Sequence, residues 1–218
     1  MEDIKYIIFD FDGTIADTID LAMHIFNKVA KEFNCEPIKE KDRDLIRSKR
    51  PQELLKSFGI TRLQLTSIIL RIRKEMSYAI PNMKIVTGIN NALREINNSE
   101  FRLGILTSNS KDNVKAFLEN NDLIDIFEFI YSEKNFFGKK RIINRMLNHE
   151  QISKRNVIYV GDETRDIEAS KKAGIPVIAV TWGLNDREIL AMAQPDQIID
   201  SPDNLLACIK QILNDHFT

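Results

Sequence analysis

The stretch that decides the fold reads Tyr6-Ile7-Ile8-Phe9-Asp10-Phe11-Asp12-Gly13-Thr14, an apolar run that ends in two closely spaced carboxylates. Residues i and i+2 of a strand point to the same side, so Asp10 and Asp12 face one site if the strand continues, and diverge around it if a turn begins at Phe11. At roughly 4 Å and an effective dielectric of about 20, two carboxylates repel by about 4 kcal/mol, which a fold tolerates only with a cation or a shared proton. The pattern favours a divalent metal at the end of this strand.

Further apolar runs rich in β-branched residues alternate with helical patterns along most of the chain. This alternation is typical of a parallel sheet whose strands are joined by crossover helices. Several runs are almost continuously apolar, which indicates strands buried on both faces. We therefore predict an α/β fold with a three-layer, Rossmann-like parallel sheet core. The expected strands are 5–9, 102–106, 127–131, 156–160, 176–181 and 197–200, and the expected helices are 112–120, 140–148, 165–173, 186–193 and 203–215.

A long segment after Thr14 breaks this alternation, because it contains no convincing strand. Apolar residues recur every three to four positions from Ile19 to Phe33, as they do on one face of a helix. A short helix over 51–58, begun by Pro51 and ended by Gly59, is expected next, followed by a longer helix that Thr61 caps and that reaches about Tyr78. The expected boundaries are 17–83 for an inserted all-helical domain and 1–16 with 84–218 for the core.

The composition limits the partners and the compartment. The 31 basic and 32 acidic side chains nearly cancel, so no overall field favours nucleic acid or an anionic membrane surface. No apolar run approaches the roughly 20 residues that span a bilayer, and the N-terminus does not resemble a signal peptide. Cys35 and Cys208 lie far apart and form no disulfide framework, which is typical of a reducing compartment. We expect a cytoplasmic protein, either a monomer or a homodimer.

Polar residues gather where the expected strands end. Open parallel sheets bind ligands beyond the carboxyl ends of their strands, at the point where the strand order reverses. We therefore expect the polar residues that follow different strands to meet at one edge of the sheet. They are Asp10 and Asp12 after the first strand, Thr107, Ser108 and Asn109 after the second, Lys139 at the head of the helix after the third, and Asp162 and Asp166 after the fourth.

This set of residues suits phosphoryl transfer. The Asp10 carboxylate can attack phosphorus to form an aspartyl-phosphate, which splits one difficult displacement into two easier ones. Asp12 can protonate the leaving oxygen and later activate water. The Thr107 hydroxyl, the backbone amides that follow it and a lysine ammonium can donate hydrogen bonds to the phosphoryl oxygens. Mg²⁺ coordinated by Asp10 and Asp162 can supply the rest, since Mg²⁺ favours one or two carboxylates with water and phosphate.

The chain resembles the haloacid dehalogenase superfamily, and specifically its phosphoglycolate phosphatase-like members. The resemblance covers essentially the whole sequence and rests on four motifs in the same order. They are Asp10-Phe11-Asp12-Gly13-Thr14, then Thr107 in Leu106-Thr107-Ser108-Asn109, then Lys139, and then Gly161-Asp162 with Asp166.

The resemblance implies a role for each of these residues. Asp10 would be the nucleophile, and Asp12 the general acid and base, whose main-chain carbonyl also binds Mg²⁺. Thr107 would bind the phosphate, Lys139 would neutralise Asp10 and the transferred group, Asp162 would bind the metal, and Asp166 would support it. Similar proteins carry a helical cap between the first and second motifs, where the strandless segment lies here. The implied activity is hydrolysis of a small phosphorylated metabolite, with phosphoglycolate as the default and nucleotide or pyrophosphate substrates also open.

Several alternatives remain at this stage. A phosphomutase similar to β-phosphoglucomutase would use the same aspartates, and a non-enzymatic signalling receiver also carries acids, a hydroxyl and a lysine at its strand ends. Dehalogenases lack a counterpart of Asp12. Lys140 competes with Lys139 for the lysine role, and Glu163 is either a further ligand or a solvated neighbour. Basic residues of the helical segment either meet a second anionic group of the substrate or form a solvated face; they are Arg47, Lys49, Arg50, Arg71, Arg73 and Lys74.

Overall fold

The computed structural model describes residues 5–49, 53, 58–132 and 138–217. Six parallel strands form one sheet in the order β3-β2-β1-β4-β5-β6. The strand order reverses beside β1, because β2 and β3 lie on one side of it and β4 to β6 on the other. The strands are β1 (Lys5–Phe9), β2 (Phe101–Thr107), β3 (Phe127–Ser132), β4 (Val157–Gly161), β5 (Val177–Val180) and β6 (Gln197–Ile199).

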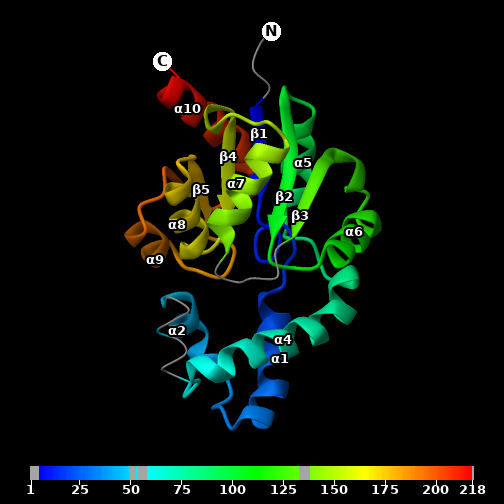
Figure 1. Cartoon of the computed structure of the whole chain (residues 1–218), viewed down its shortest axis with the longest axis vertical. Coiled ribbons are helices and arrows are strands. Elements are labelled where there is room, and N and C mark those ends of the chain that lie inside the picture. Colours follow the sequence, from blue (N-terminus) through cyan, green and yellow to red (C-terminus); the bar gives the residue numbers. More distant parts are fainter. Residues whose placement is uncertain (1–4, 50–52, 54–57, 133–137, 218) are drawn as a thin grey trace.

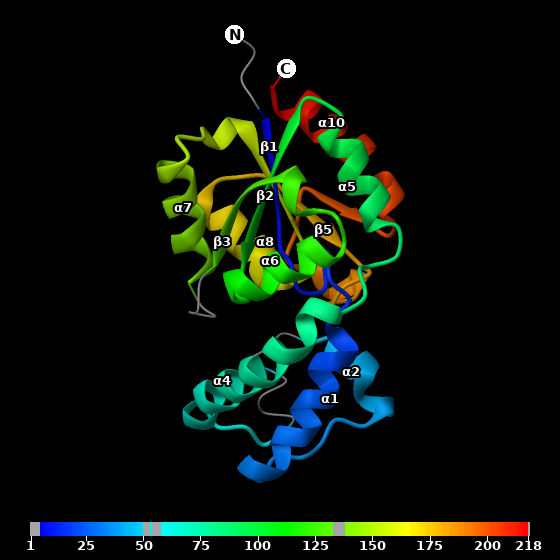
Figure 2. The ribbon, with the colours of Figure 1, turned by 90° about the vertical axis from the view of Figure 1, so that its right-hand side faces the viewer.

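Helices cover both faces of the sheet and complete the expected three layers (Figure 1, Figure 2). One apolar cluster joins α5, α6 and α10 to one face, and a second joins α7, α8 and α9 to the other. The central strand supplies both, since Ile7 and Phe9 pack into the first cluster and Ile8 into the second. The helices are α5 (Ile89–Asn97), α6 (Lys111–Asn120), α7 (Lys139–His149), α8 (Thr164–Ala173), α9 (Arg187–Met192) and α10 (Leu205–Phe217).

The helix α5 is absent from the sequence-based prediction, which placed no element between 84 and 101. Its sequence contains three asparagines, which are poor helix formers, and it is short. Four of its residues nevertheless recur at helical spacing and are buried in the core: Ile89, Ala92, Leu93 and Ile96. Burial of this one face therefore outweighs the weak intrinsic propensity of the segment.

The described residues between 17 and 83, here called the helical unit, lie beyond the carboxyl ends of the strands (Figure 1). The helix α1 (Ile19–Ala30) packs against α4 (Arg62–Ala79) around a small apolar cluster that includes Phe26 and Ile68. Thr61 caps α4 as predicted, with its hydroxyl accepting a hydrogen bond from the Gln64 amide. A short helix, α2 (Arg43–Arg47), was not predicted. The predicted helix over 51–58 falls almost wholly outside the described residues.

Two neighbouring segments connect the helical unit to the core. The Asp17 amide donates to the Lys84 carbonyl at 2.9 Å, and the Val86 amide donates to the Ile15 carbonyl at 2.9 Å. Ala16 and Ile85 pair in an antiparallel bridge between these two hydrogen bonds. The outgoing and returning chains thus form a short two-stranded ribbon.

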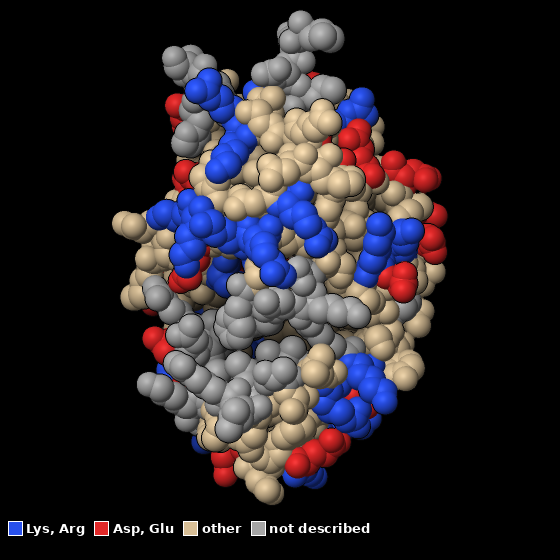
Figure 3. Space-filling model, viewed as in Figure 1, with Lys and Arg blue, Asp and Glu red and all other residues tan. Residues whose placement is uncertain are grey.

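The surface carries both signs of charge, as the near-zero net charge implies. On the face shown in Figure 3, basic side chains gather over α7, where Lys140, Arg141 and Arg145 are not buried, and acidic side chains lie toward the edges. Both cysteines are buried and unbridged. Among the described helices, none combines the length and the apolar character that crossing a bilayer requires.

Candidate active site

Three carboxylates meet where the strand order reverses. Asp10 follows β1, Asp162 follows β4, and Asp166 lies in the first turn of α8. Each offers a carboxylate oxygen within 4.8 Å of the others. Their exposed fractions are 2%, 1% and 0%, so water screens their repulsion poorly. Sequence analysis gave Asp166 only a supporting role, whereas its carboxylate lies in the same group as the other two.

Lys139, the first residue of α7, lies between two of these acids. Its ammonium donates to Asp10 Oδ2 at 2.6 Å and also to Asp166 Oδ1. Burial lowers the pKa of Lys139, but attraction to Asp10 and Asp166 outweighs burial and holds the pKa well above its ordinary value. Lys140, in contrast, is exposed. Of the two adjacent lysines, the structure therefore brings Lys139 to the carboxylates.

Asp10 is held on both of its oxygens. Its Oδ1 accepts from the Phe11 amide at 2.8 Å, and its Oδ2 accepts from Lys139. Burial raises the pKa of Asp10 to about 7, with Lys139 opposing the rise and Asp166 adding to it. A further cation at this position would favour the ionised carboxylate that nucleophilic attack needs.

Asp162 is enclosed by two glycine-containing loops. Its oxygens accept from the Thr14 hydroxyl at 2.8 Å and from the Leu184 amide at 2.7 Å. A Cβ on Gly13, whose φ is +76°, would lie 2.3 Å from an Asp162 oxygen, and a Cβ on Gly183 would lie 2.1 Å from the Asp162 Cβ. Neither loop can carry a larger residue without moving this carboxylate. Burial raises the pKa of Asp162 well above its usual range, and the neighbouring acids Glu163, Asp166 and Asp10 add to the effect.

The acid group fits a divalent cation. Carboxylate oxygens are the ligands that Mg²⁺ prefers, and a bound cation would offset the burial and the repulsion between acids that raise the pKa of Asp10 and Asp162. Within the described part of the chain, this group of three is the one cluster of acids, histidines or cysteines whose ligand atoms lie close enough together to hold a metal.

Asp12 turns to a different partner, because β1 ends at Phe9 and a turn begins. Both oxygens of Asp12 accept from the Asn109 side-chain nitrogen at 3.2 Å. Burial raises the pKa of Asp12, although the hydrogen bond from Asn109 opposes the rise. The two aspartates of the opening motif therefore diverge, which is one of the two geometries that the sequence leaves open.

The polar residues after β2 are used in different ways. Thr107 is 1% exposed, and its hydroxyl accepts from the Asn109 amide at 2.9 Å. Ser110, rather than Thr107, caps α6 by accepting from the Asn113 amide at 3.2 Å. Ser108 and Asn109 line a cavity together with Asp12 and Asp162. The second motif thus lies beside the acids, as expected.

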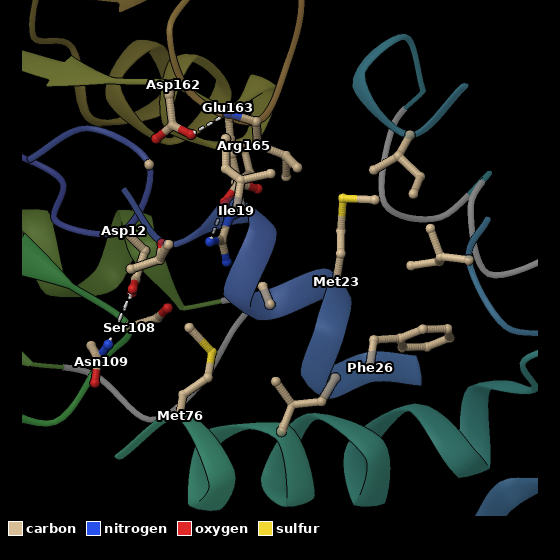
Figure 4. A pocket seen from close by; sticks show the side chains of 17 residues that line it. Asp12, Ile19, Met23, Phe26, Met76, Ser108, Asn109, Asp162, Glu163 and Arg165 are labelled. Atoms are coloured by element: carbon tan, nitrogen blue, oxygen red, sulfur yellow. Dashed lines mark hydrogen bonds and ion pairs between the residues drawn. The ribbon is translucent and has the colours of Figure 1, made fainter. Parts of the chain in front are cut away.

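The cavity, of about 340 Å³, lies between the sheet edge and the helical unit. Figure 4 shows its polar end, with Asp12, Asp162 and Glu163, and its apolar end, with Met23 and Met76 from the helical unit. Glu163 is buried and accepts from Arg165 at 2.5 Å, so it is not a solvated neighbour. Arg165 also lines the cavity and received no role from the sequence, although it stands within the fourth motif.

Hydrogen bonds join the helical unit to the loop around Asp162. The Arg47 guanidinium donates to the carbonyls of Thr181 and Gly183, both at 2.9 Å. Its own carbonyl accepts from the Asn185 side chain at 3.2 Å. Asn185 is 1% exposed. Its side-chain oxygen accepts from the Thr164 main-chain amide at 2.9 Å, and its own main-chain amide donates to the Asp162 carbonyl at 3.2 Å.

The structure describes only some of the other basic residues of the helical unit. Arg71 binds Glu32 and Glu75, and Lys74 is exposed. Lys49 is described, and its carbonyl lies 3.5 Å from the Asn185 side-chain nitrogen. Arg50 and the Arg73 side chain lie outside the description. Sequence reasoning missed Asn185, because its partners are distant in sequence and no local motif marks it.

Comparisons with known proteins agree with this geometry. The chain matches the family model of haloacid dehalogenase-like hydrolases over residues 7–180. A phosphoglycolate phosphatase from Synechococcus elongatus is 33% identical over 210 residues, covering 96% of this chain and 99% of that protein. Pyrophosphatase PpaX from Listeria monocytogenes is 24% identical over 212 residues, covering 95% and 97%.

A solved structure supports the fold. A haloacid dehalogenase-like family hydrolase from Streptococcus pneumoniae superposes with a TM-score of 0.78 at 22% identity, covering 96% of this chain and 100% of its own. The family model spans most of the chain, including Asp10 and Asp12 after β1 and the acids after β4. The chain therefore belongs to the haloacid dehalogenase-like hydrolases and is a phosphatase of that family.

Proposed function

We propose that this enzyme is a magnesium-dependent phosphatase that hydrolyses a small phosphate monoester through an aspartyl-phosphate on Asp10. The observation that carries the proposal is the buried ammonium of Lys139 between Asp10 and Asp166, with Asp162 in the same group. This arrangement fixes a nucleophile beside a permanent cation in a site where charge interactions are strong. Because the family is one of hydrolases, the non-enzymatic receiver is set aside.

The proposed reaction has two steps. In the first, an Asp10 oxygen bonds to phosphorus while the bond from phosphorus to the leaving oxygen breaks, and Asp12 gives that oxygen its proton. In the second, Asp12 takes a proton from water as the water oxygen attacks the phosphorus of phospho-Asp10, which releases phosphate and restores Asp10. The raised pKa of Asp12 supports its role as the proton donor of the first step.

Binding of the phosphoryl group is assigned to the strand-end donors. Thr107, Ser108, Asn109 and Lys139 would contact its oxygens, since all four lie at the same edge as Asp10. Asp10, Asp162 and the main-chain carbonyl of Asp12 would hold Mg²⁺, with Asp166 supporting or joining them. When bound, Mg²⁺ supplies positive charge against the acids and the phosphoryl oxygens.

The helical unit is proposed to act as a cap over this site. Its position beyond the strand ends suits a lid that excludes water, and the ribbon at Ala16 and Ile85 suits a hinge. The contacts of Arg47 with Thr181 and Gly183 would hold the closed form.

Substitution of the two aspartates tests the mechanism. We expect Asp10→Asn to lower phosphate release from an aryl phosphate by at least about a thousandfold, because an amide does not attack phosphorus. Asp12→Asn should instead accumulate acid-stable, hydroxylamine-sensitive phosphoenzyme and slow turnover by about 10²–10⁴. Cooperative thermal unfolding and an unchanged far-UV circular dichroism spectrum would show that both variants fold. An Asp10→Asn enzyme with most of its activity would refute the nucleophile, and full turnover by Asp12→Asn would refute the proton shuttle.

The same assays separate the enzyme from a phosphomutase. Incubation with hexose 1-phosphates should release free phosphate and yield no isomerised hexose phosphate. Isomerised product without phosphate release would instead support the mutase alternative.

A further inference from the structure

The cavity above the acid group has two unlike ends. Near the strand ends it is lined by Asp12, Asn109, Asp162 and their polar neighbours, whereas the helical unit contributes apolar side chains from α1, α2 and α4. Figure 4 shows Met23, Phe26 and Met76 around the part of the cavity that faces away from the aspartates. The apolar contributors include Met23, Phe26, Ile46, Ile72 and Met76.

The charge around this cavity disfavours a second anionic group on the substrate. Among the described lining residues, Arg165 is the one cation, and it lies 2.5 Å from Glu163. The other end, lined by Met23, Ile72 and Met76, has no charged side chain among its described lining residues. Arg47 donates to core carbonyls, and Arg71 pairs with Glu32 and Glu75, so neither guanidinium lines the cavity. A carboxylate moved from water into such a place loses hydration without gaining a partner.

We propose that the enzyme selects phosphate monoesters whose alcohol part is uncharged and apolar, and that it discriminates against esters with a carboxylate or a second phosphate. This inference rests on the proposed phosphatase function and concerns the substrate class of the same site. The phosphoryl group lies at the polar end, and the alcohol part extends toward Met23 and Met76. The cavity volume of about 340 Å³ is close to the volume that roughly ten water molecules occupy in the liquid. A cavity of this size accommodates a phosphoryl group and a chain of several carbons.

A series of straight-chain alkyl phosphates from methyl to hexyl measures this preference. The leaving alcohols have nearly equal acidity, so a change in kcat/KM along the series reports contact with the cavity rather than leaving-group chemistry. Each methylene that becomes buried is expected to raise kcat/KM by up to about fourfold, the equivalent of ~0.8 kcal/mol. The rise should level off when the chain fills the cavity.

Isobutyl phosphate and phosphoglycolate form a matched pair, because the two methyl groups of one replace the two carboxylate oxygens of the other. With Mg²⁺ present, isobutyl phosphate should have the higher kcat/KM, by tenfold or more. Phosphate release with a flat alkyl series, or with phosphoglycolate preferred, would overturn the inference and leave the phosphatase function standing. No release from any of these esters would instead contradict the phosphatase function itself.

Substitution of Met23 tests the location of the selective surface. Met23→Lys places a cation in the apolar end and should shift the isobutyl to phosphoglycolate ratio toward phosphoglycolate by at least tenfold, whereas Met23→Leu should keep the wild-type ratio. Leu70→Ala, at a position on α4 that is 59% exposed and outside the cavity lining, is the matched control and should leave the ratio unchanged. A ratio that Met23→Lys does not alter would contradict this location, and the wild-type ester series decides the substrate class if that variant does not fold.

Discussion

The strand ends and the helical unit border one cavity, but their residues are constrained to very different degrees. Asp10 and Asp162 have hydrogen bonds on both oxygens, and Gly13 and Gly183 leave no room for a side chain beside Asp162. The helical unit contributes Met23 and Met76, flexible side chains that tolerate exchange for others of similar volume. The geometry of the reacting groups is therefore fixed by many contacts, whereas the surface facing the rest of the substrate is free to vary.

The largest effect is expected from substitution of Lys139, which lies among the closely held residues at the strand ends. Lys139→Met leaves Asp10 and Asp166 as buried acids without their cation, so we expect at least a hundredfold loss of activity and about 3–5 kcal/mol of lost stability. Urea unfolding and ester hydrolysis measure both losses.

Lys140→Met provides the matched control for this substitution. Lys140 is adjacent but exposed, so its replacement should change stability by less than about 0.5 kcal/mol and leave activity intact. Equal losses of activity and stability in the two variants would show that the contacts of Lys139 with Asp10 and Asp166 stabilise neither the fold nor the reaction.

A smaller effect is expected where the two regions join, at Arg47. Arg47→Ala removes two hydrogen bonds from a charged donor to the loop beside Asp162, and we expect KM for methyl phosphate to rise roughly tenfold with a smaller change in kcat. Arg43→Ala is the control, because Arg43 lies on the same short helix but pairs with Asp20 on the exposed surface. If both variants raise KM alike, the contact does not hold the helical unit against the core.

The smallest effect is expected in the pH dependence of stability of the metal-free protein. In the folded state the pKa of Asp10 is raised to about 7 from an ordinary value of 3.8, so the folded protein keeps this proton after the unfolded chain has lost it. Stability due to Asp10 is therefore lost as pH rises from about 4 to about 7. The melting temperature of Asp10→Asn relative to wild type in EDTA should be a few degrees higher at pH 7.5 than at pH 5. A pH-independent difference would contradict the raised pKa.

Much of the core could be predicted from the sequence, because its strands are apolar runs between turn residues, and β4 and β5 are buried along their whole length. The resemblance to haloacid dehalogenases is confirmed, as are the α/β class and the N-cap at Thr61. The helix α5 was missed because its asparagines are poor helix formers, whereas the helix is stabilised by burial of its apolar residues. The roles of individual site residues remain predictions, although Lys139, Asp10 and Asp162 lie together.

Contacts between distant segments were beyond the sequence. Asn185 links Thr164 and Asp162 to Arg47, residues that no shared period or motif connects. The apolar residues of α1 were read as the buried face of a helix, and Met23 and Phe26 indeed lie on that face, but the same face also borders the cavity. Core packing and substrate contact use the same residue types, so a hydrophobic pattern does not separate them.

The ribbon at Ala16 and Ile85 brings the outgoing and returning chains of the helical unit to one place on the core. In evolutionary terms the whole unit then occupies the position of a single surface loop, which can be lengthened, shortened or exchanged as one contiguous segment without altering any strand of the sheet. Lineages that inherit the same acid group can thus acquire different substrate ranges by recombination at this one junction.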